Sequence, residues 1–166
     1  MSCITKILEL KGDKEFLPLP NNQVVIEGGG NYKGHEFLIT FTHYGTRCGY
    51  VAVPPNTKYD SDELSVHGGV TFEDEHHGAK NLLPTPCNDV WIGFDAAHWG
   101  DMRDFNLAKH YFGQDKDEYL QIELMEELHK DVDEMERNDP SFSHKTYDYM
   151  VDQCKSVIEQ LIEQAA

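Results

Sequence analysis

WIGFDAAHWGD, residues 91–101, joins a strand-like beginning to ionisable groups at its end. The first four residues are aromatic, β-branched or glycine and predict a β-strand. Asp95, His98 and Asp101 follow directly, so ionisable side chains stand where the strand ends, a common position for ligand contacts. Their spacing would place all three on one face of a helical turn, which suits a divalent ion or a histidine base oriented by a carboxylate.

VHGGVTF, residues 66–72, is a second stretch of this kind, and we expect a strand here as well. If the two strands are neighbours, His67 converges with the Asp and His side chains that follow residue 94. Gly68 and Gly69 would let backbone N–H groups approach a phosphate or an oxyanion. The predicted pocket is lined by His67, Gly68, Gly69, Asp95, His98, Trp99 and Asp101.

A structural role for both stretches is the alternative. Asp95 can cap the turn that follows it, and aromatic residues such as Trp91, Phe94 and Trp99 are typical of a hydrophobic core. In that case both stretches only build the sheet.

The chain before residue 60 predicts further strands. Residues 1–16 could contain a short strand, in which residues 4, 7, 8 and 10 are apolar, and residues 17–22 predict a proline-rich turn. Residues 23–26 and 36–42 predict a hairpin around a run of three glycines, and residues 50–53 predict a strand that ends at two prolines.

Two further features bear on ligands. Arg47 is one of three arginines, so we expect it, together with Arg103, to offer a fork-shaped contact to an anion. Pairing of Arg47 with a surface carboxylate is the alternative. His76 and His77 lie in a long loop and could share a metal only if a turn brought both side chains to one side.

Helical periodicity replaces strand periodicity beyond residue 105. Residues 118–135 carry an apolar stripe in an acidic segment that Pro140 terminates, and residues 146–164 form a second helix with Thr146 or Ser143 as N-cap. We therefore predict an α+β fold, a mostly antiparallel sheet with one or two C-terminal helices packed on it. The chain is expected to be a single domain over residues 1–166, strand-rich in 1–105 and helical in 115–166.

The composition limits the class of partner. The chain has 30 acidic and 14 basic residues and a formal net charge of −16, which disfavours binding to nucleic acid or to an anionic membrane. It has no apolar run long enough to cross a bilayer, and its four cysteines form no C-x-x-C pair. We therefore expect a cytoplasmic protein without a cysteine zinc site.

The order of these motifs resembles a family of small uncharacterised bacteriophage and prophage proteins. The resemblance rests on residues 49–54, 66–72 and 91–101, followed by a C-terminal helix, and it spans residues 45–165. It implies a phage origin and action in the host cytoplasm, and it transfers no settled activity. Ala96 stands where the family is expected to have a cysteine, which argues against a thiol nucleophile at that position.

Two hypotheses of different classes follow. In the first, an accessory protein with a possible counter-defence role binds a small phosphorylated or nucleotide ligand, with hydrolysis left open. His98 would be a base or metal ligand, Asp95 and Asp101 would orient it or hold a divalent cation, and Arg47 would contact the phosphate. In the second, a non-catalytic acidic inhibitor or interaction module blocks a basic surface of a host protein through residues 118–136.

Overall fold

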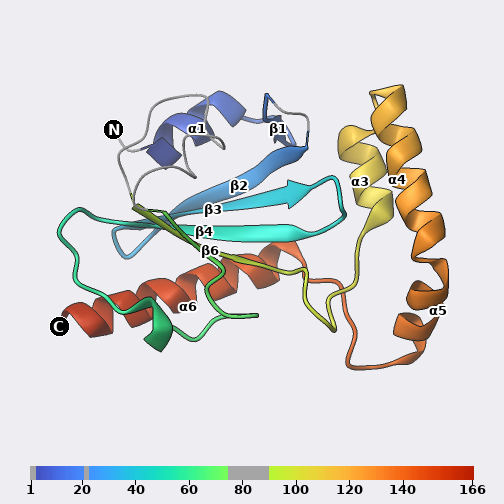
Figure 1. Cartoon of the computed structure of the whole chain (residues 1–166). Helices are drawn as coiled ribbons and strands as arrows, with labels where there is room; N and C mark the ends of the chain where they lie inside the picture. Colours follow the sequence, from blue (N-terminus) through green and yellow to red (C-terminus); the bar gives the residue numbers. More distant parts are fainter. Residues whose placement is uncertain (1–2, 21–22, 75–89) are drawn as a thin grey trace.

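A six-stranded antiparallel sheet lies at the centre of the computed structural model, which describes residues 3–20, 23–74 and 90–166 (Figure 1). The strand order is β1-β2-β3-β4-β6-β5, and every neighbouring pair is antiparallel. The strands are β1 Leu17–Pro18, β2 Val24–Tyr32, β3 His35–Thr42, β4 Arg47–Val53, β5 Phe72–Asp74 and β6 Val90–Asp95. The predicted α+β class is confirmed.

Helices cover both faces and one end of this sheet (Figure 1). The helix α6 lies along one face, α1 packs on the other, and α3, α4 and α5 stand together at the end of the sheet. Their bounds are α1 Cys3–Lys11, α3 Phe105–Phe112, α4 Lys116–Leu128, α5 Lys130–Asn138 and α6 Tyr147–Ala165, with a 3-10 turn η1 at Ser61–Glu63. No helix in these described ranges is both long and apolar enough to span a membrane.

The helix α6 packs as its sequence pattern predicted. Its buried residues recur at three- and four-residue spacing and face the side of the sheet that carries Ile39, Val51 and Phe94. The hydroxyl of Thr146 accepts a hydrogen bond from the Tyr149 N–H at 3.1 Å, so Thr146 is the N-cap. The buried residues of α6 are Met150, Cys154, Val157, Ile158 and Leu161.

The first element is a helix, and the short strand predicted within residues 1–16 is wrong. Cys3, Ile4 and Ile7 lie on one side of α1 and pack on Leu38 and other residues of the second sheet face. The i, i+3 spacing of these apolar residues fits a helix, and the face that α6 leaves open needs such a cover. Leu17–Pro18, expected to be only a turn, forms the edge strand β1, where a missing proline N–H is tolerated.

The predicted β2–β3 hairpin is confirmed, but its turn lies further along. The glycines 28–30 belong to β2, and the chain reverses at Lys33 and Gly34, which have φ values of 50° and 84°. Positive φ at both central residues is what a tight hairpin turn requires. A Cβ on Gly28 would lie 2.5 Å from the Tyr147 hydroxyl, so this glycine lets α6 begin directly against the strand.

The segment predicted as one helix over residues 118–135 is two helices. The boundary between α4 and α5 is His129. The helix α3 was not predicted, although its N-cap was visible in the sequence: Asp104 accepts a hydrogen bond from the Leu107 N–H at 2.9 Å. Phe105, Tyr111 and Ile122 bury α3 and α4 against the end of the sheet.

Candidate functional site

The two sequence signatures meet at one place, beside the N-terminal part of α6. The Nε2 of His67 lies 2.9 Å from the Asp101 Oδ2, and the backbone N–H of His98 donates to the same oxygen at 3.0 Å. The rings of His67 and His98 are 6.3 Å apart between centroids. The convergence of these residues is therefore as expected, although their roles are not decided by it.

His67 reaches this place from a loop, and the strand predicted for residues 66–72 is limited to β5 at Phe72–Asp74. Glutamine side chains on α6 replace a neighbouring strand as hydrogen-bond partners. The Gln153 Oε1 accepts from the His67 N–H at 2.9 Å, and Gln160 both accepts from and donates to the backbone of Ser65, at 2.7 and 2.8 Å. Gln164 binds the backbone of residue 60 in the same way, at 2.8 and 3.2 Å.

The loop turns at Gly68 and Gly69, whose φ values are 69° and 79°. A Cβ on Gly68 would lie 2.3 Å from the His98 ring, so only glycine permits this approach, whereas a Cβ on Gly69 would meet nothing within 4 Å. The Gly69 N–H donates to the Val66 carbonyl at 2.9 Å. The Gly69 N–H is therefore occupied within the loop and is not available to bind an anion, although that use had been expected.

Asp101 is the buried centre of the site, with a side chain only 2% exposed. A carboxylate in this position needs positive or hydrogen-bonding partners. The Lys145 Nζ lies 3.3 Å from Oδ1, and Oδ2 faces His67. With Nε2–H of His67 directed at Asp101, the Nδ1 atom accepts from the Tyr149 hydroxyl, 2.9 Å away.

Tyr149 is suited to donate that hydrogen bond. Burial, and after it the negative charge of Asp101, raises the pKa of the Tyr149 phenol. The hydroxyl therefore keeps its proton at neutral pH. Tyr149 and Gln153 were missed from the sequence because only the buried stripe of the helix was considered, and Lys145 was missed because it lies before the helix begins. Their signal was present: Tyr149, Gln153, Gln160 and Gln164 recur at helical spacing beside that stripe.

His98 forms a second pair with a carboxylate. Its Nε2 lies 3.1 Å from the Asp95 Oδ1, and the Thr71 hydroxyl donates to the other carboxylate oxygen at 2.9 Å. The His98 side chain is 38% exposed, so its pair faces solvent while the His67 pair is largely covered. The predicted helical turn is wrong, because residues 96–104 form no helix. The Asp95 carboxylate lies beside the His98 ring, and the Asp101 carboxylate lies beside the His67 ring.

In the described part of the chain the Arg47 side chain makes no hydrogen bond or ion pair with either histidine or its carboxylate, and it meets the cluster only at the backbone of Lys145. Its guanidinium binds Glu27 through two hydrogen bonds of 2.6 and 3.0 Å and donates to the Lys145 carbonyl at 3.0 Å. Tyr111 donates to the same carboxylate at 2.8 Å. The guanidinium expected to contact a phosphate is therefore occupied by a carboxylate, as in the alternative. Both charged side chains are nearly buried, so this carboxylate is not the surface group that the alternative expected.

Trp99 is 78% exposed and touches Phe142 edge-on, with ring centroids 4.5 Å apart. It is therefore not part of the core. Next to His98 it offers an aromatic surface to solvent, which is an ordinary feature of sites that stack a planar ligand.

Metal ligation has no support in residues 3–20, 23–74 and 90–166, where no group of three or more His, Cys, Asp or Glu side chains is placed to hold an ion. His76 and His77 lie outside the described residues.

Cys48 is a free thiol next to Asp95 in the strand register, and burial together with the Asp95 charge raises its pKa to about 11. It is therefore a poor nucleophile at neutral pH.

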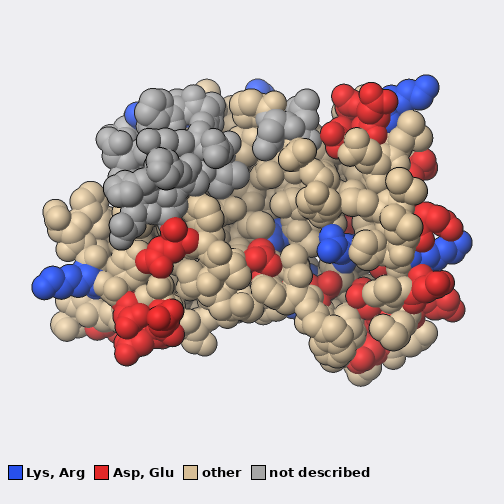
Figure 2. Space-filling view, viewed as in Figure 1, with Lys and Arg blue, Asp and Glu red and all other residues tan. Residues whose placement is uncertain are grey.

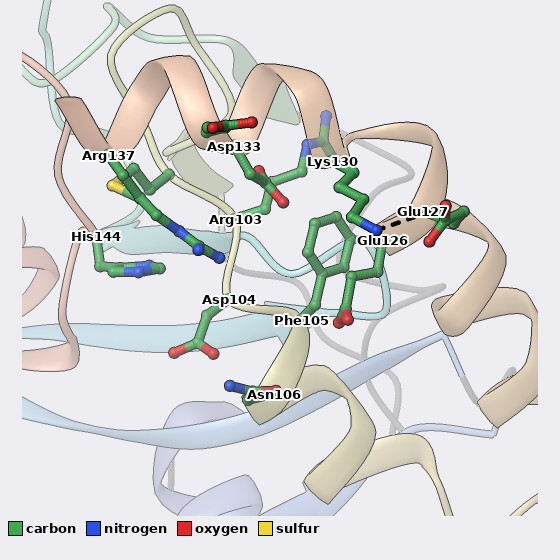
Figure 3. A pocket seen from close by; sticks show the side chains of 12 residues that line it. Arg103, Asp104, Phe105, Asn106, Glu126, Glu127, Lys130, Asp133, Arg137 and His144 are labelled. Carbon is green, nitrogen blue, oxygen red and sulfur yellow. Dashed lines mark ion pairs between the residues drawn. The ribbon is translucent and has the colours of Figure 1, made fainter. Parts of the chain in front are cut away.

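Two hollows flank the cluster. One of about 390 Å³ lies beside the glycine loop and is lined by Gly69, Thr71 and the acidic Asp62 and Glu73 among others. Another, of about 500 Å³, lies between the start of α3 and the pair α4–α5 (Figure 3). Its lining includes basic groups such as Arg137 and acidic groups such as Asp133.

No protein-family model matches the sequence, and no curated protein or solved structure is similar to it at a significant level. The chemistry of the two histidine pairs is therefore what bears on function.

Proposed function

We propose that the protein binds a small phosphorylated or nucleotide ligand against His67, His98 and Trp99, and that it acts on this ligand by acid–base chemistry. The observation that carries the proposal is the pair of carboxylate-bound imidazoles, His67–Asp101 and His98–Asp95, with ring centroids 6.3 Å apart. At this separation, one imidazole can take a proton from the group that attacks a phosphate ester while the other gives a proton to the oxygen that leaves.

The chemical roles follow from the hydrogen bonds. The contact of His98 Nε2 with Asp95 leaves Nδ1 as the acceptor, so His98 can remove a proton from water or from a hydroxyl group. His67, supported by Asp101 at Nε2, can return a proton to a leaving oxygen from its protonated form, with that oxygen taking the place of the Tyr149 hydroxyl at Nδ1. Neither step requires a metal, although a divalent cation brought with the ligand is compatible with the acidic surroundings.

The ligand would be recognised by stacking and by the histidines. A nucleobase can lie on the exposed ring of Trp99, beside His98. Because Arg47 and the Gly69 N–H are engaged elsewhere, the phosphate contact falls to the imidazoles. A role in the host cytoplasm against a defence system belongs to the same proposal and rests on the phage resemblance alone.

The test is calorimetry with mono-, di- and cyclic nucleotides, with and without Mn²⁺ or Zn²⁺, on the wild type and on His98→Ala. We expect at least a tenfold loss of affinity in the variant, because the imidazole touches the ligand directly. His110→Ala is the matched control, since His110 forms an exposed pair with Glu15 at 2.9 Å on another part of the surface. Equal affinities of the three proteins, or no binding of any nucleotide, would contradict the proposal.

A further inference from the structure

Exposed apolar side chains are concentrated on α4 and α5. Of the ten large hydrophobic residues that are exposed in the described part of the chain, six lie on these two helices. Five of them recur every three or four residues, the spacing of one helical face, and are between 41% and 73% exposed. We call them the α4–α5 stripe: Leu120, Leu124, Leu128, Val132 and Met135.

The stripe is continuous across the junction of the two helices. The His129 N–H donates to the Met125 carbonyl at 3.1 Å, and the Asp133 N–H donates to the His129 carbonyl at 2.7 Å. Helical hydrogen bonding therefore runs through the boundary. From Leu120 to Met135 there are fifteen steps of ~1.5 Å along the helix, so the stripe is about 22 Å long.

The protein's own core does not use the stripe. Ile122 is the one buried residue of α4, and α5 has none within its range. The contacts of α4 with α3 are made by its other side, which carries Ile122, Met125 and the Glu126–Lys109 ion pair of 3.1 Å. The apolar face of the two helices is thus turned away from the rest of the molecule.

Acidic residues border the stripe on both sides. Residues 116–138 contain nine Asp or Glu and three Lys or Arg, a net charge of −6 out of −16 for the whole chain. Acidic side chains appear along the right-hand edge of Figure 2, where Figure 1 places α4 and α5. A second copy of this chain would bring two such segments together, and an anionic membrane would be repelled as well.

We propose that the α4–α5 stripe docks an amphipathic helix of a partner protein that carries Lys or Arg on both sides of an apolar face. The apolar side chains of the two helices pack together, and the acidic rim of α4–α5 faces the basic rim of the partner. This surface is distinct from the histidine cluster, so the proposal stands independently of the small-ligand site.

Two synthetic helical peptides of 18 residues test the proposal, one with leucines at helical spacing among lysines and one with the same leucines among glutamates. Calorimetry with the full chain at 150 and 500 mM NaCl compares the wild type with the double variant Leu124→Ser, Leu128→Ser. We expect the lysine peptide to bind the wild type and to bind the variant at least tenfold more weakly at both salt concentrations. The glutamate peptide should not bind.

The matched control is Leu10→Ser with Ile162→Ser, two exposed apolar residues on other helices, which should bind like the wild type. Equal binding of the lysine peptide to the stripe variant would overturn the proposal, since attraction would then be electrostatic alone. A wild-type dimer in sedimentation velocity that the stripe variant loses would also overturn it, because a second copy would then be the occupant.

Discussion

Gly68 has the strictest requirement of any residue in the candidate site. It combines a φ of 69° with a His98 ring that would lie 2.3 Å from an added Cβ. Gly69 shares the positive φ, 79°, but has open space around it. The two glycines therefore separate the effect of backbone strain from the effect of displacing His98.

Gly68→Ala is expected to destabilise the fold by ~1–3 kcal/mol and to move the His98 ring away from Asp95. Gly69→Ala should lower the free energy of unfolding by less than Gly68→Ala, because it adds backbone strain without a clash with the His98 ring. Urea unfolding measures the difference, and the NMR signals of the His98 ring report its displacement. A His98 spectrum that is unchanged in Gly68→Ala would contradict the close approach.

Arg47 was singled out from the sequence, but its partner was left open between a bound anion and a carboxylate. Arginine is rare in this acidic chain, which drew attention to Arg47. Its partner Glu27, twenty residues earlier, was not recognised because it was assigned to a flexible glycine turn. Only the extension of β2 through these residues places the carboxylate beside the guanidinium.

We expect Arg47→Met to lower the free energy of unfolding by ~3–5 kcal/mol, because the charge of Glu27 is left buried without its partner. The double variant Arg47→Met, Glu27→Leu should recover much of this loss, since both charges are then gone. A double-mutant cycle in urea measures the coupling. Additive losses in the double variant would show that the pair is not coupled.

At the scale of elements, the glutamines of α6 position the loop that carries His67. Gln153 and Gln160 bind the backbone of His67 and Ser65, and nothing in the local sequence of residues 60–71 reveals this. Alternation of apolar residues in 66–72 suggested a strand, whereas the loop has a helix as its hydrogen-bonding neighbour. Tertiary contacts therefore overrode the local pattern.

Gln153→Ala together with Gln160→Ala should release this loop. We expect faster hydrogen exchange of the Ser65 and His67 amides, by at least tenfold, and a loss of stability of ~1–3 kcal/mol. Gln121→Ala, on the exposed side of α4, serves as the control and should change neither quantity. Unchanged exchange in the α6 variant would mean that the glutamines do not hold the loop.

Elements with a regular pattern were predictable, and those set by packing were not. The strands β3, β4 and β6 agree with the sequence because both of their faces are covered, so their apolar and aromatic residues form short continuous runs. The helix α6 agrees because its one buried face imposes the helical period. The helix α1 was mistaken for a strand because nine residues show too few turns to distinguish the two periods. The apolar stripe within residues 118–135 was visible in the sequence, but its exposure was not, because amphipathicity alone does not say what covers it.

For the whole molecule, the arrangement of layers explains why the site lies where it does. The sheet brings the end of β6 to the edge of α6, and α6 in turn holds the loop of residues 60–67 in place (Figure 1). His98 comes from the first of these segments and His67 from the second. The convergence of the two histidines was predictable from the signatures, but Lys145 and Tyr149, which complete it, come from the C-terminal region.

The most direct measurement of the central claim is native mass spectrometry of protein purified from cells and then incubated with nucleotides, comparing wild type with His67→Ala, His98→Ala. The account predicts a bound mass of nucleotide size on the wild type that is absent from the double variant, with circular dichroism showing both proteins folded. The same bound mass on both proteins, or a wild type without any bound nucleotide, would contradict a ligand site at the two histidine pairs.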